Sequence, residues 1–163
     1  MKWYHPSKSD KFPSTPWLHP NAIEYLESIL KSDMQVMEFG GGGSTLWFAD
    51  KVKQVITCEP DHNWFEKLFD ISPENVSVFN RLEPLKMPAD LIFIDGEPVE
   101  IRGNWLIAAV ELVNAGGYVV LDNANRPEYK AERRWLEKHM MLVYTSDGNE
   151  ENTHYLVTEF WQK

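Results

Sequence analysis

The segment VMEFGGGGST, residues Val36 to Thr45, decides the fold of this chain. A short apolar run ends in four consecutive glycines, and a helix-like segment, TLWFA, follows directly. Glycine lets the backbone adopt positive φ angles and lets a ligand approach the main chain without meeting a Cβ atom. Ser44 is placed to cap the new helix, whose unpaired N–H groups attract an anionic group. Because four glycines cost backbone entropy, we expect a cofactor loop between a strand and a helix, with a plain tight turn as the alternative.

The residues around the glycines narrow the choice of cofactor. The dinucleotide fingerprint GxGxxG fails, since a count that starts at Gly40 reaches Thr45 where the third glycine should stand. Glu59 follows the next strand-like run and lies 19 residues after Gly40. That spacing is close to the roughly 20 residues expected for a carboxylate that binds a ribose diol. Glu38 would repel a pyrophosphate but suits a ligand that carries an ammonium and a sulfonium group.

These residues resemble those of the class I S-adenosylmethionine-dependent methyltransferases. The run EFGGGG, residues Glu38 to Gly43, is similar to their motif I, E/D-x-G-x-G-x, and the likeness extends from Val36 to Asn123. It implies an α/β fold in one domain over residues 1–163. The expected sheet is Rossmann-like, doubly wound, mostly parallel and seven-stranded, with helices on both faces and an antiparallel C-terminal hairpin. The cofactor contacts that the resemblance implies are Glu38, Gly40, Gly41, Gly42, Ser44, Thr45, Glu59, Asn80 and Asp95.

The hydrophobic pattern agrees with this order of elements. An extended, proline-containing arm is expected over residues 1–20, and helices and strands alternate after it. The glycine pair within 114–117 is expected to end a helix. The predicted helices cover residues 21–31, 44–51, 61–70, 104–113 and 129–139, and the predicted strands cover 35–39, 54–58, 76–79, 89–94, 118–121, 140–145 and 155–160.

The composition limits the setting and the partners of the protein. The 163 residues fit one domain with a real core. The net charge of −9 argues against nonspecific attraction to nucleic acid or to anionic lipid. The single cysteine, Cys58, excludes a disulfide framework, and no apolar run approaches transmembrane length. We therefore expect a soluble, cytoplasmic protein that acts on a small molecule and does not bind a membrane. The sequence does not determine its oligomeric state.

Polar residues follow two further strands at the edge of the sheet where ligands bind. Asp95 follows the fourth strand, and Asp122 and Asn123 follow the fifth. Three oxygen ligands suit Mg²⁺ or Ca²⁺. The spacing is similar to that of the metal ligands in catechol and caffeoyl-coenzyme A type O-methyltransferases, a resemblance that implies a metal site at these three residues. Alternatively, the aspartate after strand four stands in a motif common to methyltransferases without a metal, and the later pair caps a turn.

Without a metal, Asp95 is the candidate general base, because desolvation after a buried strand raises the pKa of a carboxylate. Arg102 either binds an acidic group of the substrate or pairs with Glu97 or Glu100. Methyl transfer needs little beyond holding a nucleophile in line with an activated methyl group. The Asn/Asp-Pro-Pro-Tyr/Phe signature of amino-methylating enzymes is absent, which favours a hydroxyl on a small molecule or sugar. The alternatives are a non-catalytic cofactor-binding or partner subunit and a nicotinamide-dependent reductase.

Overall fold

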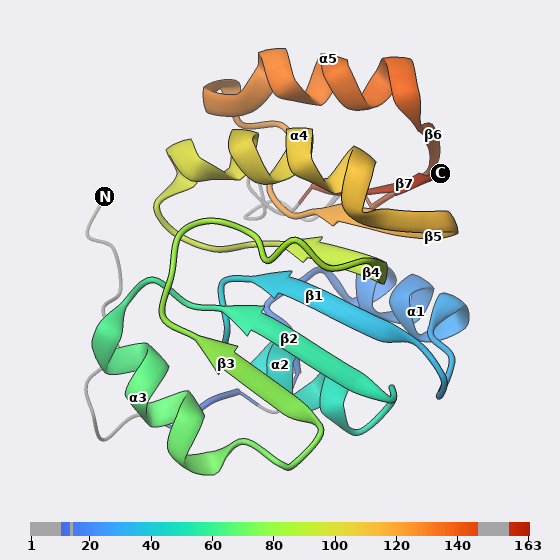
Figure 1. Cartoon of the computed structure of the whole chain (residues 1–163). Coiled ribbons are helices and arrows are strands. Elements are labelled where there is room, and N and C mark those ends of the chain that lie inside the picture. Colours follow the sequence, from blue (N-terminus) through green and yellow to red (C-terminus); the bar gives the residue numbers. More distant parts are fainter. Residues whose placement is uncertain (1–10, 14, 147–156) are drawn as a thin grey trace.

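The computed structural model describes residues 11–13, 15–146 and 157–163, and these residues form one sheet flanked by helices (Figure 1). The strand order is β3-β2-β1-β4-β5-β7-β6; the first five strands along the chain are parallel, and β7 runs antiparallel to both of its neighbours. The strands are β1 (Gln35–Phe39), β2 (Gln54–Cys58), β3 (Val76–Phe79), β4 (Ala89–Ile94), β5 (Val113–Leu121), β6 (Met141–Ser146) and β7 (Thr158–Gln162). The sequence prediction of a doubly wound, seven-stranded sheet with a C-terminal hairpin is confirmed.

In the part of the chain that the structure describes, five α-helices connect and cover these strands. They are α1 (Pro20–Ile29), α2 (Gly43–Ala49), α3 (His62–Ile71), α4 (Arg102–Leu112) and α5 (Lys130–His139), with short 3₁₀ turns at η1 (Val99–Ile101) and η2 (Pro127–Tyr129). In Figure 1, α4 and α5 lie together on one side of the sheet, and α1 and α2 lie on the other. Within the described ranges, no helix has the length and apolar character needed to cross a membrane.

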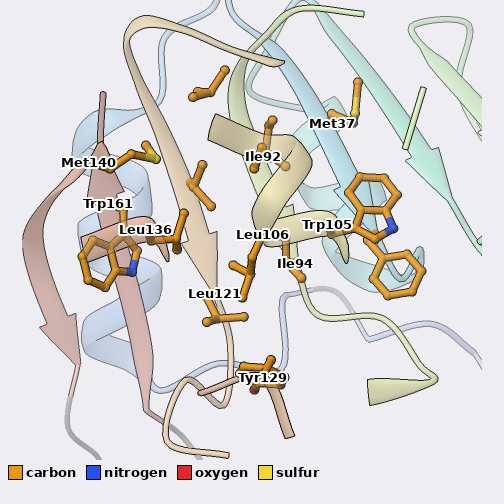
Figure 2. Packing of buried hydrophobic residues seen from close by; sticks show 14 of the residues in the cluster. Met37, Ile92, Ile94, Trp105, Leu106, Leu121, Tyr129, Leu136, Met140 and Trp161 are labelled. Atoms are coloured by element: carbon orange, nitrogen blue, oxygen red, sulfur yellow. The ribbon is translucent and has the colours of Figure 1, made fainter. Parts of the chain in front are cut away.

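Strand β4 shows why the central strands are apolar throughout. Ile92 and Ile94 belong to the cluster under α4 and α5, together with Trp105 and Leu106 (Figure 2). Leu91 and Phe93 of β4 belong instead to the cluster under α1 and α2. Because successive side chains of a strand point to opposite faces, a strand that is buried on both faces needs apolar residues at nearly every position.

Strand β5 differs from its prediction, since residues 114–117 belong to the strand and do not end helix α4 with a glycine cap. Val113 pairs with Ala89 and Tyr118 pairs with Leu91, so four residues of β5 bulge opposite one residue of β4. A Cβ atom on Gly117 would lie 2.6 Å from the Asp90 carbonyl oxygen. The glycine there serves the close approach of two strands.

The two ends of the chain also depart from the prediction. Helix α1 begins at Pro20, and His19 caps it by accepting a hydrogen bond from the Asn21 N–H through Nδ1 at 3.2 Å. Strand β7 begins at Thr158, later than the predicted strand at 155–160, of which residues 155 and 156 lie outside the described ranges. Residues 1–10 and 14 of the predicted arm also lie outside them.

Candidate cofactor and active site

A cavity of about 800 Å³ opens at the carboxyl edge of the parallel strands. This volume is within the range of about 300–1,000 Å³ of small-ligand sites. The walls come from the loops after β1, β2, β4 and β5 and from the segment before α1: residues 13, 17, 40–44, 59–61, 63, 64, 95–100, 126 and 128. Of the residues predicted to contact a cofactor, six line the cavity, namely Gly40, Gly41, Gly42, Ser44, Glu59 and Asp95. Glu38, Thr45 and Asn80 are not among the lining residues.

The glycine loop depends on close backbone contacts. Gly40 has a φ of 94°, and a Cβ atom there would lie 2.3 Å from the Cα of Gly96. The Gly41 N–H donates to Glu59 Oε2 at 2.9 Å, and its carbonyl accepts a hydrogen bond from Trp64 Nε1. The Gly41 residue is therefore held through both of its backbone polar groups, which fixes the loop before any ligand arrives.

Glu38 lies beneath the loop and does not reach the cavity. Its side chain is fully buried and accepts hydrogen bonds from Ser44 Oγ and Thr45 Oγ1. Thr45 Oγ1 in turn accepts from the Gly42 N–H at 2.9 Å. Burial raises the pKa of Glu38 to about 7, while the Ser44 and Thr45 hydroxyls oppose the shift. The prediction that Ser44 caps the helix is wrong, because α2 begins at Gly43. The Ser44 hydroxyl instead donates its hydrogen bond to Glu38.

Glu59 faces the cavity from the end of β2. Its two carboxyl oxygens accept from the Gly41 N–H and, at 2.7 Å, from the Asp61 N–H. Burial raises the pKa of Glu59 to about 8, and these N–H groups partly offset the shift. Asp61 caps helix α3 by accepting from the Trp64 N–H at 2.8 Å. Asn80 donates to the carbonyls of Glu59 and Pro60 at 2.8 and 3.0 Å, so it holds the turn that carries Glu59.

Arg102 organises the opposite wall from a fully buried position, with 1% of its surface exposed. Its Nε donates to the Gly96 carbonyl at 2.8 Å and its first terminal nitrogen to the Asp122 carbonyl at 2.9 Å. The second terminal nitrogen donates to the Asp95 carbonyl at 2.6 Å and to Asp95 Oδ1 at 3.1 Å. The expected pairing with Glu97 or Glu100 is wrong, because the ion pair of Arg102 is with Asp95. The guanidinium instead ties the ends of β4 and β5 together.

Asp95 presents a side chain that is 28% exposed, at the edge of the cavity. Burial raises the pKa of Asp95, and the Arg102 guanidinium opposes that shift. Burial, followed by the Asp95 charge, raises the pKa of Asp122 well above its ordinary value. Because the Asp95 charge raises the pKa of Asp122, the two carboxyl groups do not titrate independently.

The predicted metal ligands do not gather in the cavity. Asp122 is 3% exposed, and its Oδ1 accepts from Thr158 Oγ1 at 2.8 Å. The carbonyl of Asn123, a residue with a φ of 52°, accepts from the Tyr129 hydroxyl. Among the described residues, no three His, Cys, Asp or Glu side chains are grouped as a metal site requires. The predicted Mg²⁺ thus gains no support from these contacts, since Arg102 already supplies a positive charge at Asp95.

Three aromatic residues at or beside the cavity were not among the predicted site residues. Trp64 lies in the predicted helix 61–70, and its indole reaches the glycine loop. Trp17, in the segment before α1, lines the cavity with 62% of its surface exposed. Phe12 packs edge-on against Trp64, with ring centroids 4.3 Å apart. A weak signal existed for Trp17, because this aromatic residue stands in the proline-containing segment before the first predicted helix.

No family model matches the chain, and no curated protein matches its sequence. The structure is similar to NodS from Bradyrhizobium japonicum WM9, an N-methyltransferase, in complex with S-adenosylhomocysteine. That match has a TM-score of 0.62 at 14% identity and covers 85% of this chain and 81% of that one. An rRNA methylase from Streptococcus thermophilus gives a TM-score of 0.67 at 16% identity, covering 86% and 92%.

A third match is the precorrin-6y C5,15-methyltransferase from Geobacter metallireducens GS-15, with a TM-score of 0.68 at 17% identity over 96% of both chains. This chain has the class I methyltransferase fold. The matched methyltransferases are named for nitrogen, ribosomal RNA and a precorrin, so the methyltransferase fold does not by itself select an acceptor. The acceptor must be argued from the walls of the cavity.

Proposed function

We propose that this protein is an S-adenosylmethionine-dependent methyltransferase that binds its cofactor in the cavity at the carboxyl edge of the sheet. The supporting observation is that one cavity joins the glycine loop, Glu59 and Asp95. Residues 40–43 present backbone without side chains, which lets a ligand lie against the loop. Glu59 would accept hydrogen bonds from a ribose diol, and Asp95 would face the ammonium at the other end of the cofactor. These groups fit S-adenosylmethionine better than a pyrophosphate-containing dinucleotide.

The proposed reaction is methyl transfer to a hydroxyl group of a small molecule or sugar. Bound S-adenosylmethionine would supply a methyl group that is already activated. The part of the protein is to hold the acceptor oxygen in line and to accept its proton. Asp95 is the proposed general base, because its partly exposed carboxyl lines the cavity and Arg102 opposes the rise in its pKa. The exposed carboxylates Glu97, Glu100 and Glu128 at the cavity disfavour a nucleic acid phosphate.

Two other functions remain to be separated from this one. A non-catalytic cofactor-binding subunit would have the same glycine loop and the same cavity. A nicotinamide-dependent reductase would need room for a pyrophosphate near the carboxyl group of Glu59. Binding and turnover measurements distinguish all three functions.

The first experiment is calorimetric titration of the full chain with S-adenosylhomocysteine, S-adenosylmethionine and NADH. We expect the two adenosyl ligands to bind and NADH not to bind. Glu59→Gln should weaken adenosyl binding, because an amide has one acceptor oxygen where both oxygens of the carboxyl group accept from backbone N–H groups. Glu74→Gln, an exposed residue outside the cavity, is the matched control and should bind as the wild type does. Binding of NADH alone would favour the reductase.

The second experiment follows methyl transfer from labelled S-adenosylmethionine to a panel of alcohols, sugars, amines and RNA. Transfer to a hydroxyl that is lost in Asp95→Asn even at saturating S-adenosylmethionine supports the proposed reaction. Transfer to an amine or to RNA would keep the enzyme class and reject the oxygen acceptor. Tight adenosyl binding without transfer to any member of the panel favours the non-catalytic subunit.

A further inference from the structure

The side chain of Arg102 acts on both the backbone and the carboxyl group at the edge of the cavity. Three of its four hydrogen bonds go to the carbonyls of Gly96, Asp122 and Asp95, and the fourth goes to the Asp95 carboxylate. A guanidinium presents donors in a rigid planar fork, so one arginine fixes several acceptors at set relative positions. The acceptor groups of Arg102 directly follow strands β4 and β5.

The effect of Arg102 extends to the glycine loop through Gly96. The Gly96 residue lies directly against Gly40, where a Cβ atom would be 2.3 Å from the Gly96 Cα. The Asp95 N–H donates to the Phe39 carbonyl at 3.0 Å, which joins the same two loops one residue earlier. A shift of the segment Asp95–Gly96 would therefore move the wall of the cavity against the first glycine.

We propose that Arg102 is a positioning residue for the amino acid end of the cofactor. It holds the Asp95 carboxylate toward the cavity and Gly96 against the glycine loop. This inference rests on the proposed function. Glu59, on the β2 side, suits the ribose, so the amino acid end of the same ligand extends toward Asp95 on the β4 side. An ammonium there is attracted to a fixed carboxylate, and a carboxylate free to rotate would bind it less well.

The test compares two ligands that share the adenosyl group. S-adenosylhomocysteine carries the amino acid end and 5′-methylthioadenosine lacks it. Arg102→Lys keeps the charge but replaces the planar fork by one ammonium. In calorimetric titration of the full chain, we expect the Kd for S-adenosylhomocysteine to rise about tenfold, because bonds to charged groups are lost or misplaced. The Kd for 5′-methylthioadenosine should change less than about twofold, since that ligand makes no contact at Asp95.

The ratio of the two dissociation constants separates positioning from a merely structural role. A general loosening of the fold would raise both constants together and leave the ratio unchanged, and that result would overturn the proposal. Arg133→Lys is the matched control, because Arg133 makes a two-point contact with Glu159 away from the cavity. Neither constant should change in this control.

A second variant keeps the proposal testable if Arg102→Lys does not fold. Asp95→Asn leaves the three carbonyl bonds of Arg102 in place and removes only the charged partner. It should shift the same ratio in the same direction, and an unchanged ratio would refute the inference. If the wild type binds neither ligand, the proposed function itself fails. If it binds both equally well, the cofactor site stands and the role of Arg102 at the amino acid end does not.

Discussion

The two walls of the cavity are held in opposite ways. The loop after β1 rests on carboxyl groups: Glu38 accepts from two hydroxyls of the loop region, and Glu59 accepts from the Gly41 N–H. The segments after β4 and β5 are held by a cation, because Arg102 donates hydrogen bonds to three of their carbonyls. A buried backbone polar group needs a hydrogen-bond partner. An N–H group therefore needs a buried acceptor, and a carbonyl needs a buried donor.

This difference gives the two walls different responses to pH. Burial brings the pKa of Glu38 to about 7 and that of Glu59 to about 8, so the supports of the glycine loop change protonation near neutral pH. Arginine keeps its charge at every pH at which proteins fold. The β4 wall is thus held by a fixed charge, whereas the loop after β1 is held by groups that titrate.

The largest expected effect tests how closely the two walls meet. Gly40→Ala places a Cβ atom 2.3 Å from the Gly96 Cα at a φ of 94°. The added strain and overpacking should lower the free energy of unfolding by about 3–5 kcal/mol and abolish S-adenosylhomocysteine binding. Denaturant titration and calorimetry measure the two effects.

Gly116→Ala is the control for the backbone angle alone. Gly116 has a φ of 77°, but no described atom lies within 4 Å of the position of a Cβ atom. Its cost should be about 1–2 kcal/mol, the conformational cost of a positive φ, with binding unchanged. Equal losses in both variants would show that contact between the two walls contributes nothing.

The next effect is a pH dependence that comes from Glu38. Because burial raises its pKa to about 7, the native state keeps a proton that the unfolded chain has already released. The stabilisation is complete below the unfolded pKa and is lost as the pH rises through about 7. Between the pKa of Glu38 in the unfolded chain and its folded value of about 7, the free energy of unfolding should fall by up to about 1.4 kcal/mol per pH unit.

Glu38→Gln removes this titration and should flatten the profile, measured by denaturant unfolding between pH 5 and pH 8. The part due to Glu59 will remain, because its pKa is also raised by burial. Glu74→Gln should leave the profile as it is in the wild type. A slope that is unchanged in Glu38→Gln would mean that Glu38 is ionised in the folded state.

Much of the fold was predictable because it follows from local rules. The run Ala89–Ile94 is apolar at nearly every position, as a strand buried on both faces must be, and its prediction is confirmed. The helix end predicted at the glycine pair 116–117 was wrong, because glycine after a helical pattern is typical of a helix end but here lies in strand β5. Only the approach of the Asp90 carbonyl, in another strand, shows that Gly117 serves strand pairing.

The candidate site likewise contains residues that the sequence predicts and residues that it does not. The residues after β1, β2 and β4 were predicted to meet because parallel strands end at one edge, and Glu59 and Asp95 do line one cavity. The buried role of Arg102 was not predictable, since its acceptors come from two loops separated in sequence. The pairing of Phe12 with Trp64 likewise depends on how the segment before α1 lies over the loop.

A smaller effect is expected from the indole that supports the glycine loop. Trp64→Phe removes the N–H that donates to the Gly41 carbonyl and keeps a ring for the contact with Phe12. One neutral hydrogen bond contributes about 1 kcal/mol, so the Kd for S-adenosylhomocysteine should rise about fivefold by calorimetry. Trp47→Phe is the control: Trp47 lies in α2, packs against Phe48 and does not line the cavity. If both variants bind alike, the Trp64 hydrogen bond has no part in cofactor affinity.

The smallest effect is expected from divalent metal. The Arg102 guanidinium lies 3.1 Å from Asp95 Oδ1, where a cation would have to bind, and Asp122 Oδ1 already accepts from Thr158. A divalent ion bound at Asp95 would lie next to the fixed positive charge of Arg102, which repels it. We therefore expect Mg²⁺ or EDTA to change the Kd for S-adenosylhomocysteine by less than about twofold and to leave the melting temperature unchanged, since an ion that binds only the native state would raise it. A rise in melting temperature with Mg²⁺ that disappears in Asp122→Asn would instead establish the metal site and would show that Arg102 moves away from Asp95.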